Sequence, residues 1–556
     1  MQLQLSFAAL LAGVLFALSS VQDVDARPTK RNPGMVTLPL KRVPRAEGIP
    51  PTVYLQQHIN RAHKRLARMT GREAPSDHQL RQSIERRMLD YEDVSLSKRF
   101  NRHGVKVPRT NRIGLAGAGH VPRAEIKQKG KASQGAAGVI GTGAKGAAGA
   151  KVAAGAKGAA GAKGVAGAKG AAAGAGAAAG AGVAAASGAA SGDNGTPGTG
   201  SQIAANNVPS GVEAAGAPTA SNSLGLNIEG NDVGYLATVQ MGTPPQDFFI
   251  LMDSGSADLW VGSENCQSTA GGGCGDHTFL GTNSSSSFVD SGKAFQVTYG
   301  TGAVNGTIVN DDISVAGLAL NAHTFGVADT ETDDFADNQV PFDGLMGLAQ
   351  STLSEQQTLT PPESLAAAGL ISDAITSFKI SRAADNLNDG EITFGGLDPT
   401  KFDASTLTTF DNVNAQGFWE GAMDSVTVDG TDTGLSGRTA ILDTGTTLIV
   451  APPDDAAAVH QLIQGSASDG QGGFTIPCTT NASVALSFSG TSFAIDPRDI
   501  AFQPVDPNNP TGDCVSGISS GQIGAATEWL VGDVFLKNAY FSVDVGKNAI
   551  SLAKLT

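Results

Sequence analysis

The stretch Phe248–Trp260, FFILMDSGSADLW, decides how the rest of this chain is interpreted. An apolar run ends in Asp253, small residues follow, and an apolar run then resumes. An ionised carboxylate at the end of a buried strand is costly unless neighbouring groups hold it. Ser254, Gly255 and Ser256 follow directly and are candidates for that support. The pattern predicts a buried carboxylate with a polar turn built around it.

The same pattern occurs a second time, in TAILDTGTTLIV, where Asp443 is followed by Thr444, Gly445 and Thr446. Each copy is followed about ninety residues later by an apolar pair before a glycine, in FDGLMGLA and EWLVGDVF. Similar elements at similar spacing predict two halves related by an approximate two-fold axis. Such an axis would bring the turns of Asp253 and Asp443 together.

Charge divides the chain of 556 residues into two parts. The first 200 residues hold 29 of the 38 Lys and Arg but 11 of the 52 Asp and Glu, so their net charge is +18. The remaining residues carry −32. Opposite signs in one chain suggest that the parts bind each other or have separate fates. Nucleic acid is disfavoured as a partner, because the basic part has neither interleaved aromatic residues nor a recognised binding motif.

The N-terminal run LSFAALLAGVLFALSS is typical of a secretory signal, although the usual positive residues before it are missing. The sequence has no second long apolar run and no hydrophobic tail, so we expect a secreted, extracellular protein without a membrane anchor. Residues 114–200 are mostly Ala and Gly, with Lys at every sixth position through part of the segment. Such a composition cannot bury a core, and we interpret it as a flexible spacer.

Four cysteines and four glycosylation sequons fit an exported protein. Sequence order favours the disulfides Cys266–Cys274 and Cys478–Cys514. The candidate glycosylation sites are Asn194, Asn283, Asn305 and Asn481.

From about residue 222 the chain is dominated by short apolar and alternating runs with Gly, Asp and Asn turns, which is typical of strands. Short helices are expected at PESLAAAGLI and DDAAAVHQLIQ, and the basic segment has a helical pattern in LQQHINRAHKRLARM. The motif GISSG at Gly517–Gly521 fits a serine hydrolase, but no strand-to-helix turn is expected around it. The three histidines of the acidic region are far apart and form no metal-binding motif.

The region from about residue 222 resembles the pepsin-like aspartic endopeptidases, and the secreted fungal type is most similar. The resemblance rests on DSGSADLWV, VTYGTG, FDGLMGLA, ILDTGTT and WLVGDVFLKNAYFSVD in this order. It implies a mostly β, two-lobed acid protease fold with pseudo-two-fold symmetry and a cleft between the lobes. Asp253 and Asp443 would share a proton and activate a water molecule. Ser254 and Thr444 would tie the two turns together, while Ser256 and Thr446 would orient the carboxylates.

The segment TYGTG fits the flap of this family, a hairpin that closes over the substrate. Tyr299 and Gly300 would cover the cleft, and Trp260 would support the Tyr299 hydroxyl. Some fungal relatives carry Asp at the flap tip and accept Lys before the cut bond. Here the tip residue is Thr301, so we expect bulky apolar residues around the cut.

These observations predict a secreted aspartic endopeptidase made as a zymogen and acting on proteins and peptides. Its own propeptide would inhibit it, through a Lys or Arg near the dyad that the sequence does not identify. No cofactor or metal is implied, and a monomer is expected. The final cut is expected between about Ala217 and Gly225. The alternatives are a catalytically inactive pepsin-like binding protein and a cell-wall or matrix protein organised by the Ala/Gly repeat. The predicted segments are a signal peptide at 1–20, a basic propeptide at 21–113, a spacer at 114–221, an N-terminal catalytic lobe at 222–398 and a C-terminal catalytic lobe at 399–556.

Overall fold

The computed structural model describes residues 51–76, 78–88, 208–230, 232–300, 302–521 and 527–556. The predicted signal peptide, most of the spacer and part of the basic propeptide lie outside these residues. All described residues fall within one compact unit. Among them, no helix is both long and apolar enough to cross a bilayer.

The first half of the acidic region folds around a nine-stranded sheet with the order β1-β3-β4-β5-β10-β6-β9-β8-β7. Strand β5 ends at Asp253 and pairs in parallel with β10, which places Gly347 opposite the aspartate. The alternating burial along β8 shows one face turned to the core and one to solvent. The strands are β1 Val212–Glu213, β3 Asn227–Glu229, β4 Gly234–Met241, β5 Gln246–Asp253, β6 Leu259–Ser268, β7 Val289–Thr298, β8 Ala303–Val315, β9 Leu318–Glu331 and β10 Gly344–Gly347.

The second half repeats this local arrangement in a five-stranded sheet with the order β14-β17-β26-β18-β25. Strand β17 ends one residue before Asp443 and pairs in parallel with β26. Two four-stranded sheets, β16-β15-β21-β22 and β19-β20-β24-β23, complete this half. The strands are β14 Glu420–Met423, β15 Ser425–Val428, β16 Thr431–Asp432, β17 Arg438–Leu442, β18 Ile449–Ala451, β19 Ala467–Ser468, β20 Phe474–Pro477, β21 Val484–Phe488, β22 Thr491–Ala494, β23 Ala501–Pro504, β24 Asp513–Ser516, β25 Ile518–Ser520 and β26 Glu528–Val531.

A six-stranded sheet with the order β13-β28-β27-β11-β12-β2 contains strands from both halves. Phe378 of β11 stacks on Phe541 of β27 with ring centroids 5.6 Å apart, so the two halves share a core. The predicted boundary at 398/399 falls between strands of this sheet and stays a prediction. The strands are β2 Ser223–Gly225, β11 Ile375–Lys379, β12 Glu391–Phe394, β13 Thr408–Asp411, β27 Tyr540–Asp544 and β28 Ala549–Ala553.

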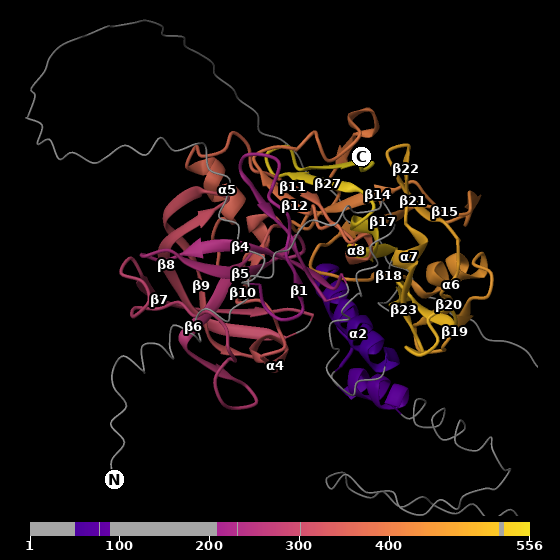
Figure 1. The fold of residues 1–556 in the computed structure, drawn as a ribbon, viewed down its shortest axis with the longest axis horizontal. Coiled ribbons are helices and arrows are strands. Elements are labelled where there is room, and N and C mark those ends of the chain that lie inside the picture. Colours follow the sequence, from indigo (N-terminus) through magenta and orange to yellow (C-terminus); the bar gives the residue numbers. More distant parts are fainter. Residues whose placement is uncertain (1–50, 77, 89–207, 231, 301, 522–526) are drawn as a thin grey trace, which may run out of the picture. The chain divides into compact units, whose positions relative to one another are not determined.

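These sheets confirm the predicted mostly β, two-lobed fold, whose lobes appear as magenta-to-salmon and orange-to-yellow groups of strands in Figure 1. Helices are few and short apart from α2. The α-helices are α2 Pro51–Met69, α4 Asp333–Ala336, α5 Pro361–Ala367, α6 Pro453–Gln461, α7 Pro497–Ile500 and α8 Asp533–Leu536, and residues 78–88 are also helical. Single 3₁₀ turns occur at Ser351–Leu353, Ala383–Asp385 and Ala404–Thr406.

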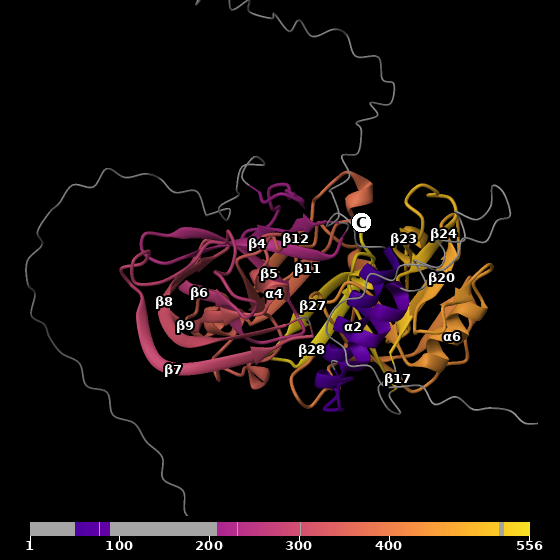
Figure 2. The same ribbon diagram turned by 90° about the horizontal axis from the view of Figure 1, so that it is seen from below.

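Helix α2 lies in the segment predicted to be a basic propeptide and packs against the acidic lobes. Its apolar residues recur every three or four positions, which places them on one face. Leu55 and Ile59 join the main core, while Ala62 and Leu66 pack in a second cluster with Phe418, Ile441, Val450 and Leu530. Figure 1 shows the helix beside β18, and Figure 2 shows the same helix from below. Helix α2 is therefore docked on the lobes through buried apolar surface.

Candidate active site

Reciprocal hydrogen bonds tie the two aspartate turns together. The backbone N–H of Ser254 donates to the Thr444 hydroxyl at 2.9 Å, and the backbone N–H of Thr444 donates to the Ser254 hydroxyl at 3.0 Å. Each hydroxyl then donates across to a backbone carbonyl of the opposite strand, Leu442 at 3.1 Å and Met252 at 2.8 Å. All four bonds are buried, so the relative position of the turns is well defined.

Each carboxylate is fully buried and is held by its own turn in the same way. The backbone N–H of Gly255 donates to Oδ1 of Asp253 at 2.9 Å, and the Ser256 hydroxyl donates to Oδ2 at 2.6 Å. The second turn repeats both contacts on Asp443, from the Gly445 N–H at 2.9 Å and the Thr446 hydroxyl at 2.6 Å. Two oxygens of each carboxylate are thus oriented by separate donors.

The glycines of the two turns let the carboxylates approach each other. A Cβ atom at Gly255 would collide with the Asp443 carboxylate, and one at Gly445 would collide with the Asp253 carboxylate. Neither turn could therefore carry a side chain at this position without moving the opposite aspartate. The structure brings together all eight residues that the sequence placed in the two motifs.

Arg65 of α2 lies on both aspartates. Its guanidinium makes ion pairs with Asp253 and Asp443, and its Nη2 donates to Asp443 Oδ1 at 2.8 Å. Burial raises the pKa of Asp443 to about 6; the Arg65 charge opposes this rise and the Asp253 carboxylate adds to it. Burial by itself would lower the pKa of Arg65, but the two carboxylates outweigh it and raise that pKa above its ordinary value. Arg65 is therefore a permanent cation on the dyad.

The contacts of α2 continue on both sides of Arg65. Arg61 lies 3.7 Å from Asp334, and Arg68 lies 2.5 Å from Glu355. A further pair, Arg72–Glu528 at 2.9 Å, forms just after the helix ends. The three arginines within α2, Arg61, Arg65 and Arg68, are spaced by four and three residues, which puts them on one helix face. This spacing predicts a basic helix face in the sequence, but it does not single out Arg65 within that face.

The hairpin of β7 and β8 covers the site as expected for the flap. Tyr299 is buried, and its hydroxyl accepts a hydrogen bond from Trp260 Nε1 at 2.8 Å. Its ring packs edge-on against Phe335, with centroids 5.5 Å apart. A Cβ atom at Gly300 would collide with the Arg61 carbonyl, so the flap lies directly against α2. Thr301 lies outside the described residues.

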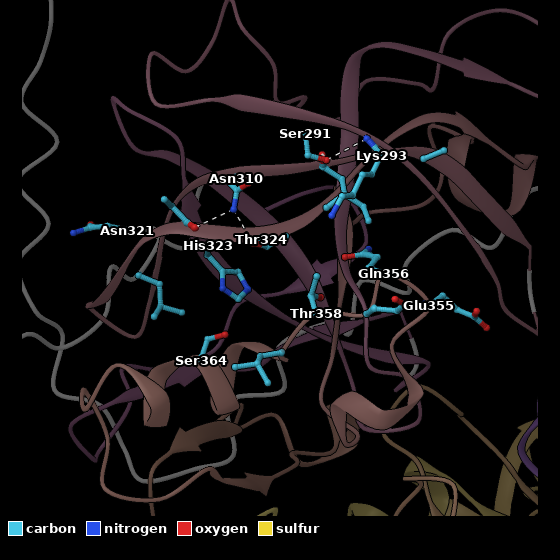
Figure 3. A pocket seen from close by; sticks show the side chains of 16 residues that line it. Ser291, Lys293, Asn310, Asn321, His323, Thr324, Glu355, Gln356, Thr358 and Ser364 are labelled. Atoms are coloured by element: carbon cyan, nitrogen blue, oxygen red, sulfur yellow. Dashed lines mark hydrogen bonds between the residues drawn. The ribbon is translucent and has the colours of Figure 1, made fainter.

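Two cavities differ in their relation to this site. One, of about 130 Å³, lies beside the dyad and is lined by the aspartate turn at Gly255 and Ser256, by the flap at Tyr299 and by Arg65 and Arg68. A larger one, of about 710 Å³, lies among β7, β8, β9 and residues 355–364 and touches neither aspartate (Figure 3). The smaller cavity is the one placed for chemistry at the dyad, despite its size.

The remaining predicted site residues lie away from the dyad. The structure joins Cys266 with Cys274 and Cys478 with Cys514. Among the candidate glycosylation sites, Asn283, Asn305 and Asn481 are exposed, and Asn194 lies outside the described residues. The central Ser519 of GISSG is fully buried within strand β25, away from any strand-to-helix turn. A serine nucleophile at that position finds no support in this geometry.

Comparison with known proteins identifies the family that this fold and site define. The family model for eukaryotic aspartyl protease matches residues 234–555, and the chain belongs to that family. A fungal protein named "Probable aspartic-type endopeptidase CTSD", from Trichophyton verrucosum, is 38% identical over 349 residues, which are 63% of this chain and 66% of that protein. The match thus spans slightly less than two thirds of this relative.

Two further relatives match over a larger share of their own length. Rhizopuspepsin from Rhizopus chinensis is 36% identical over 329 residues, which are 58% of this chain and 79% of that protein. Pepsin A from Sus scrofa is 31% identical over 333 residues, which are 58% of this chain and 81% of that protein. All of these matches confirm the resemblance seen in the sequence motifs.

Proposed function

We propose that the chain is an aspartic endopeptidase that is secreted as a zymogen and hydrolyses peptide bonds of proteins at acidic pH. The observation that carries this proposal is the pair of buried carboxylates, Asp253 and Asp443, held together by two interlocked turns. The relatives named as aspartic-type endopeptidase, rhizopuspepsin and pepsin support the same activity. Secretion rests on the apolar N-terminal run and the cysteine content. The enzyme is proposed to act as a monomer.

The dyad would work through one shared proton. Two close carboxylates cannot both ionise easily, so one stays protonated while the other is charged. The charged carboxylate takes a proton from water as the water oxygen bonds to the scissile carbonyl carbon, and the protonated one donates to the carbonyl oxygen. A proton then reaches the amide nitrogen, the C–N bond breaks, and the dyad regains its shared proton. Ser256 and Thr446 keep the two outer carboxylate oxygens oriented during these transfers.

The docked helix would keep the precursor inactive. The Arg65 guanidinium lies where a substrate carbonyl and the attacking water must meet both carboxylates. Acidification protonates carboxylates while arginine stays charged, so the attraction that holds the helix weakens as pH falls. The arm would then leave the cleft and be cut by the enzyme itself or by a neighbouring copy. Residues 223–225 form the buried strand β2, which favours a final cut at Ala217–Asn222 within the expected interval.

The residues around the cut are proposed to be bulky and apolar. Val297, Tyr299, Leu353 and Phe418 give the cavity beside the dyad an apolar wall. Thr301 at the flap tip supplies no carboxylate for a lysine next to the cut bond. Both features favour apolar side chains at the positions that flank the scissile bond.

Acid incubation of the purified precursor tests the proposal directly. We expect the arm to be cut, N-terminal sequencing to place the new end near Ala217–Asn222, and the product to digest proteins unless pepstatin is present. An inactive binding protein would bind peptides without producing fragments. A precursor that is already fully active at neutral pH would contradict the zymogen mechanism but leave the dyad assignment intact.

A further inference from the structure

The cavity beside the dyad has an acidic wall. Glu355 and Asp258 line it together with the aspartate turn and the flap residue Tyr299. The docked helix inserts Arg68 and Met69 into the same space. Release of the helix would therefore leave a larger subsite that begins at the dyad and ends at a carboxylate.

We infer that Glu355 forms an acidic subsite of the mature enzyme, which takes an arginine or lysine side chain of the substrate at the second or third residue from the cut bond. This inference rests on the proposed endopeptidase function and adds a substrate preference to it. It concerns a position beyond the residues that flank the cut, so an apolar preference at the cut itself is compatible with it.

The docked helix shows which chemistry Glu355 accepts. Arg68 Nη2 lies 2.5 Å from Glu355 Oε1, and the two side chains are 42% and 50% exposed. Among the ion pairs of the described residues, Arg68 is the only cation that Glu355 contacts. In the mature enzyme this carboxylate loses its partner and faces the open cleft.

The backbone at Glu355 is fixed by a buried carboxylate. Asp258 accepts hydrogen bonds from the Ser354 hydroxyl at 2.8 Å, from the Glu355 N–H at 3.2 Å and from the Gln356 N–H at 3.0 Å. Asp258 follows the catalytic Asp253 by five residues in the same segment. The loop that carries Glu355 is therefore attached to the aspartate turn, and Glu355 is positioned relative to the cut bond before substrate binds.

Glu355 points into the cleft and away from the larger cavity. Figure 3 shows its carboxylate directed away from His323, although the residue also borders that cavity. Its charge is therefore available to a substrate in the cleft.

The helix geometry also gives the distance from the cut. Arg65 and Arg68 are three residues apart, so their backbone positions are separated by about 4.5 Å along the helix axis. An extended substrate covers about 3.3 Å per residue. In a substrate that runs in the same direction as the docked helix, the residue one or two positions beyond the one at the cut bond, the second or third from the cut, is thus level with Glu355.

Paired peptide substrates test the inference after acid activation. Each pair differs only in Arg or Gln at one position, scanned over three positions on both sides of one cut site. The assays run at pH 5.5, above the reference pKa of free carboxylates. We expect the wild type to have a higher kcat/KM for the Arg peptide at one position. In Glu355→Gln the ratio of kcat/KM for Arg over Gln should fall there by roughly two- to fivefold, the effect of a partly exposed ion pair.

Two further variants make the result specific. Glu355→Arg should favour Glu over Gln at the same position, which a general loss of structure would not produce. Asp373→Asn removes an exposed charge outside the cleft and should keep the wild-type ratio. An unchanged ratio of kcat/KM for Arg over Gln in Glu355→Gln, or an equal fall of that ratio in Asp373→Asn, would overturn the role of Glu355. Cleavage of the Gln peptides by the same proteins would still uphold the proposed function. Failure of the activated wild type to cleave any peptide would overturn both.

Discussion

Replacing His58 should shift the activation of the precursor to lower pH. His58 lies on the docked helix, is 7% exposed, and its Nε2 has no hydrogen-bond partner among the described residues. Its ring meets Tyr54 edge-on with centroids 4.5 Å apart. Burial, and to a lesser extent the charge of Arg61, lowers the pKa of His58 to about 3. The docked helix therefore holds this histidine neutral.

The sign of the effect follows from comparing the docked and released arms. In a released, solvated arm the pKa of His58 returns to about 6.5. Above about pH 6.5 His58 is neutral in both the docked and the released arm. Between about pH 6.5 and pH 3 it is protonated only in the released arm, so acidification through this range favours release. The gain is about 1.4 kcal/mol per pH unit, or about 2 kcal/mol at pH 5, which corresponds to roughly a thirtyfold change in the release equilibrium.

His58→Phe removes this proton while keeping an aromatic ring against Tyr54. The measurement is the first-order rate of precursor processing between pH 3 and pH 7, followed by gel and by digestion of a peptide. Relative to its own rate at pH 6.5, where the released His58 is already half protonated, His58→Phe should gain up to about sixteenfold less than the wild type at pH 5. His78→Phe, at an exposed position of the 78–88 helix, is the matched control and should follow the wild type. Superimposable pH profiles for all three proteins would refute the reasoning.

Other changes test the dyad, its inhibitor and the flap. Asp253→Asn or Asp443→Asn should lower peptide hydrolysis by at least about a thousandfold, because either change removes the shared-proton pair; an unchanged circular dichroism spectrum checks the fold, and full activity in either variant would contradict the assignment. Arg65→Gln leaves both carboxylates without their cation, so the precursor should be processed at pH 6.5, where the wild type is stable; equal rates at that pH would argue against Arg65 as the inhibitory residue. Thr301→Asp should improve acceptance of Lys before the cut in cleavage-site profiling, and a wild-type preference for Lys there would refute the specificity argument.

The sequence predicts the dyad well because its residues are adjacent in each motif. Asp253 and the three residues after it act within one turn, so their spacing along the chain is also their spacing in the site. Duplication of the motif then predicts that the two turns meet. The same holds for Tyr299 and Trp260, which the family motifs named and the structure joins by a hydrogen bond.

Element ends were predicted less well, for a local reason. The segment PESLAAAGLI was expected to be helical, but α5 ends at Ala367. Gly369 has a φ of +70°, in the left-handed region that commonly ends helices, so the last residues of the segment leave the helix. The helical pattern of LQQHINRAHKRLARM, in contrast, lies entirely within α2.

Arg65 and Glu355 could not be assigned from the sequence, because their roles depend on where α2 lies. The charge division predicted that a basic residue would approach the dyad, but many basic residues of the predicted propeptide meet that expectation equally well. Arg65 is the one that reaches the dyad because the apolar face of Leu55, Ile59 and Leu66 docks on the lobes and places the neighbouring Arg65 side chain against both aspartates. Long-range packing thus determines which basic residue contacts the dyad.

The inhibitory contact and the pH response must reside in different groups. Arg65 stays charged at every pH at which the enzyme could work, since the dyad raises its pKa further, so it blocks the site without sensing acid. The response to acid must therefore come from other groups that the docked helix buries or contacts. Burial raises the pKa of Asp443 to about 6 despite the charge of Arg65, so this carboxylate takes up a proton as pH falls past that value and its contact with Arg65 weakens. Burial also lowers the pKa of His58 and of His63, whose Nε2 lies 2.9 Å from the Ser520 carbonyl. Both histidines take up protons more readily once the helix is released, so their effects add, and loss of His58 alone should make the activation less steep without abolishing it.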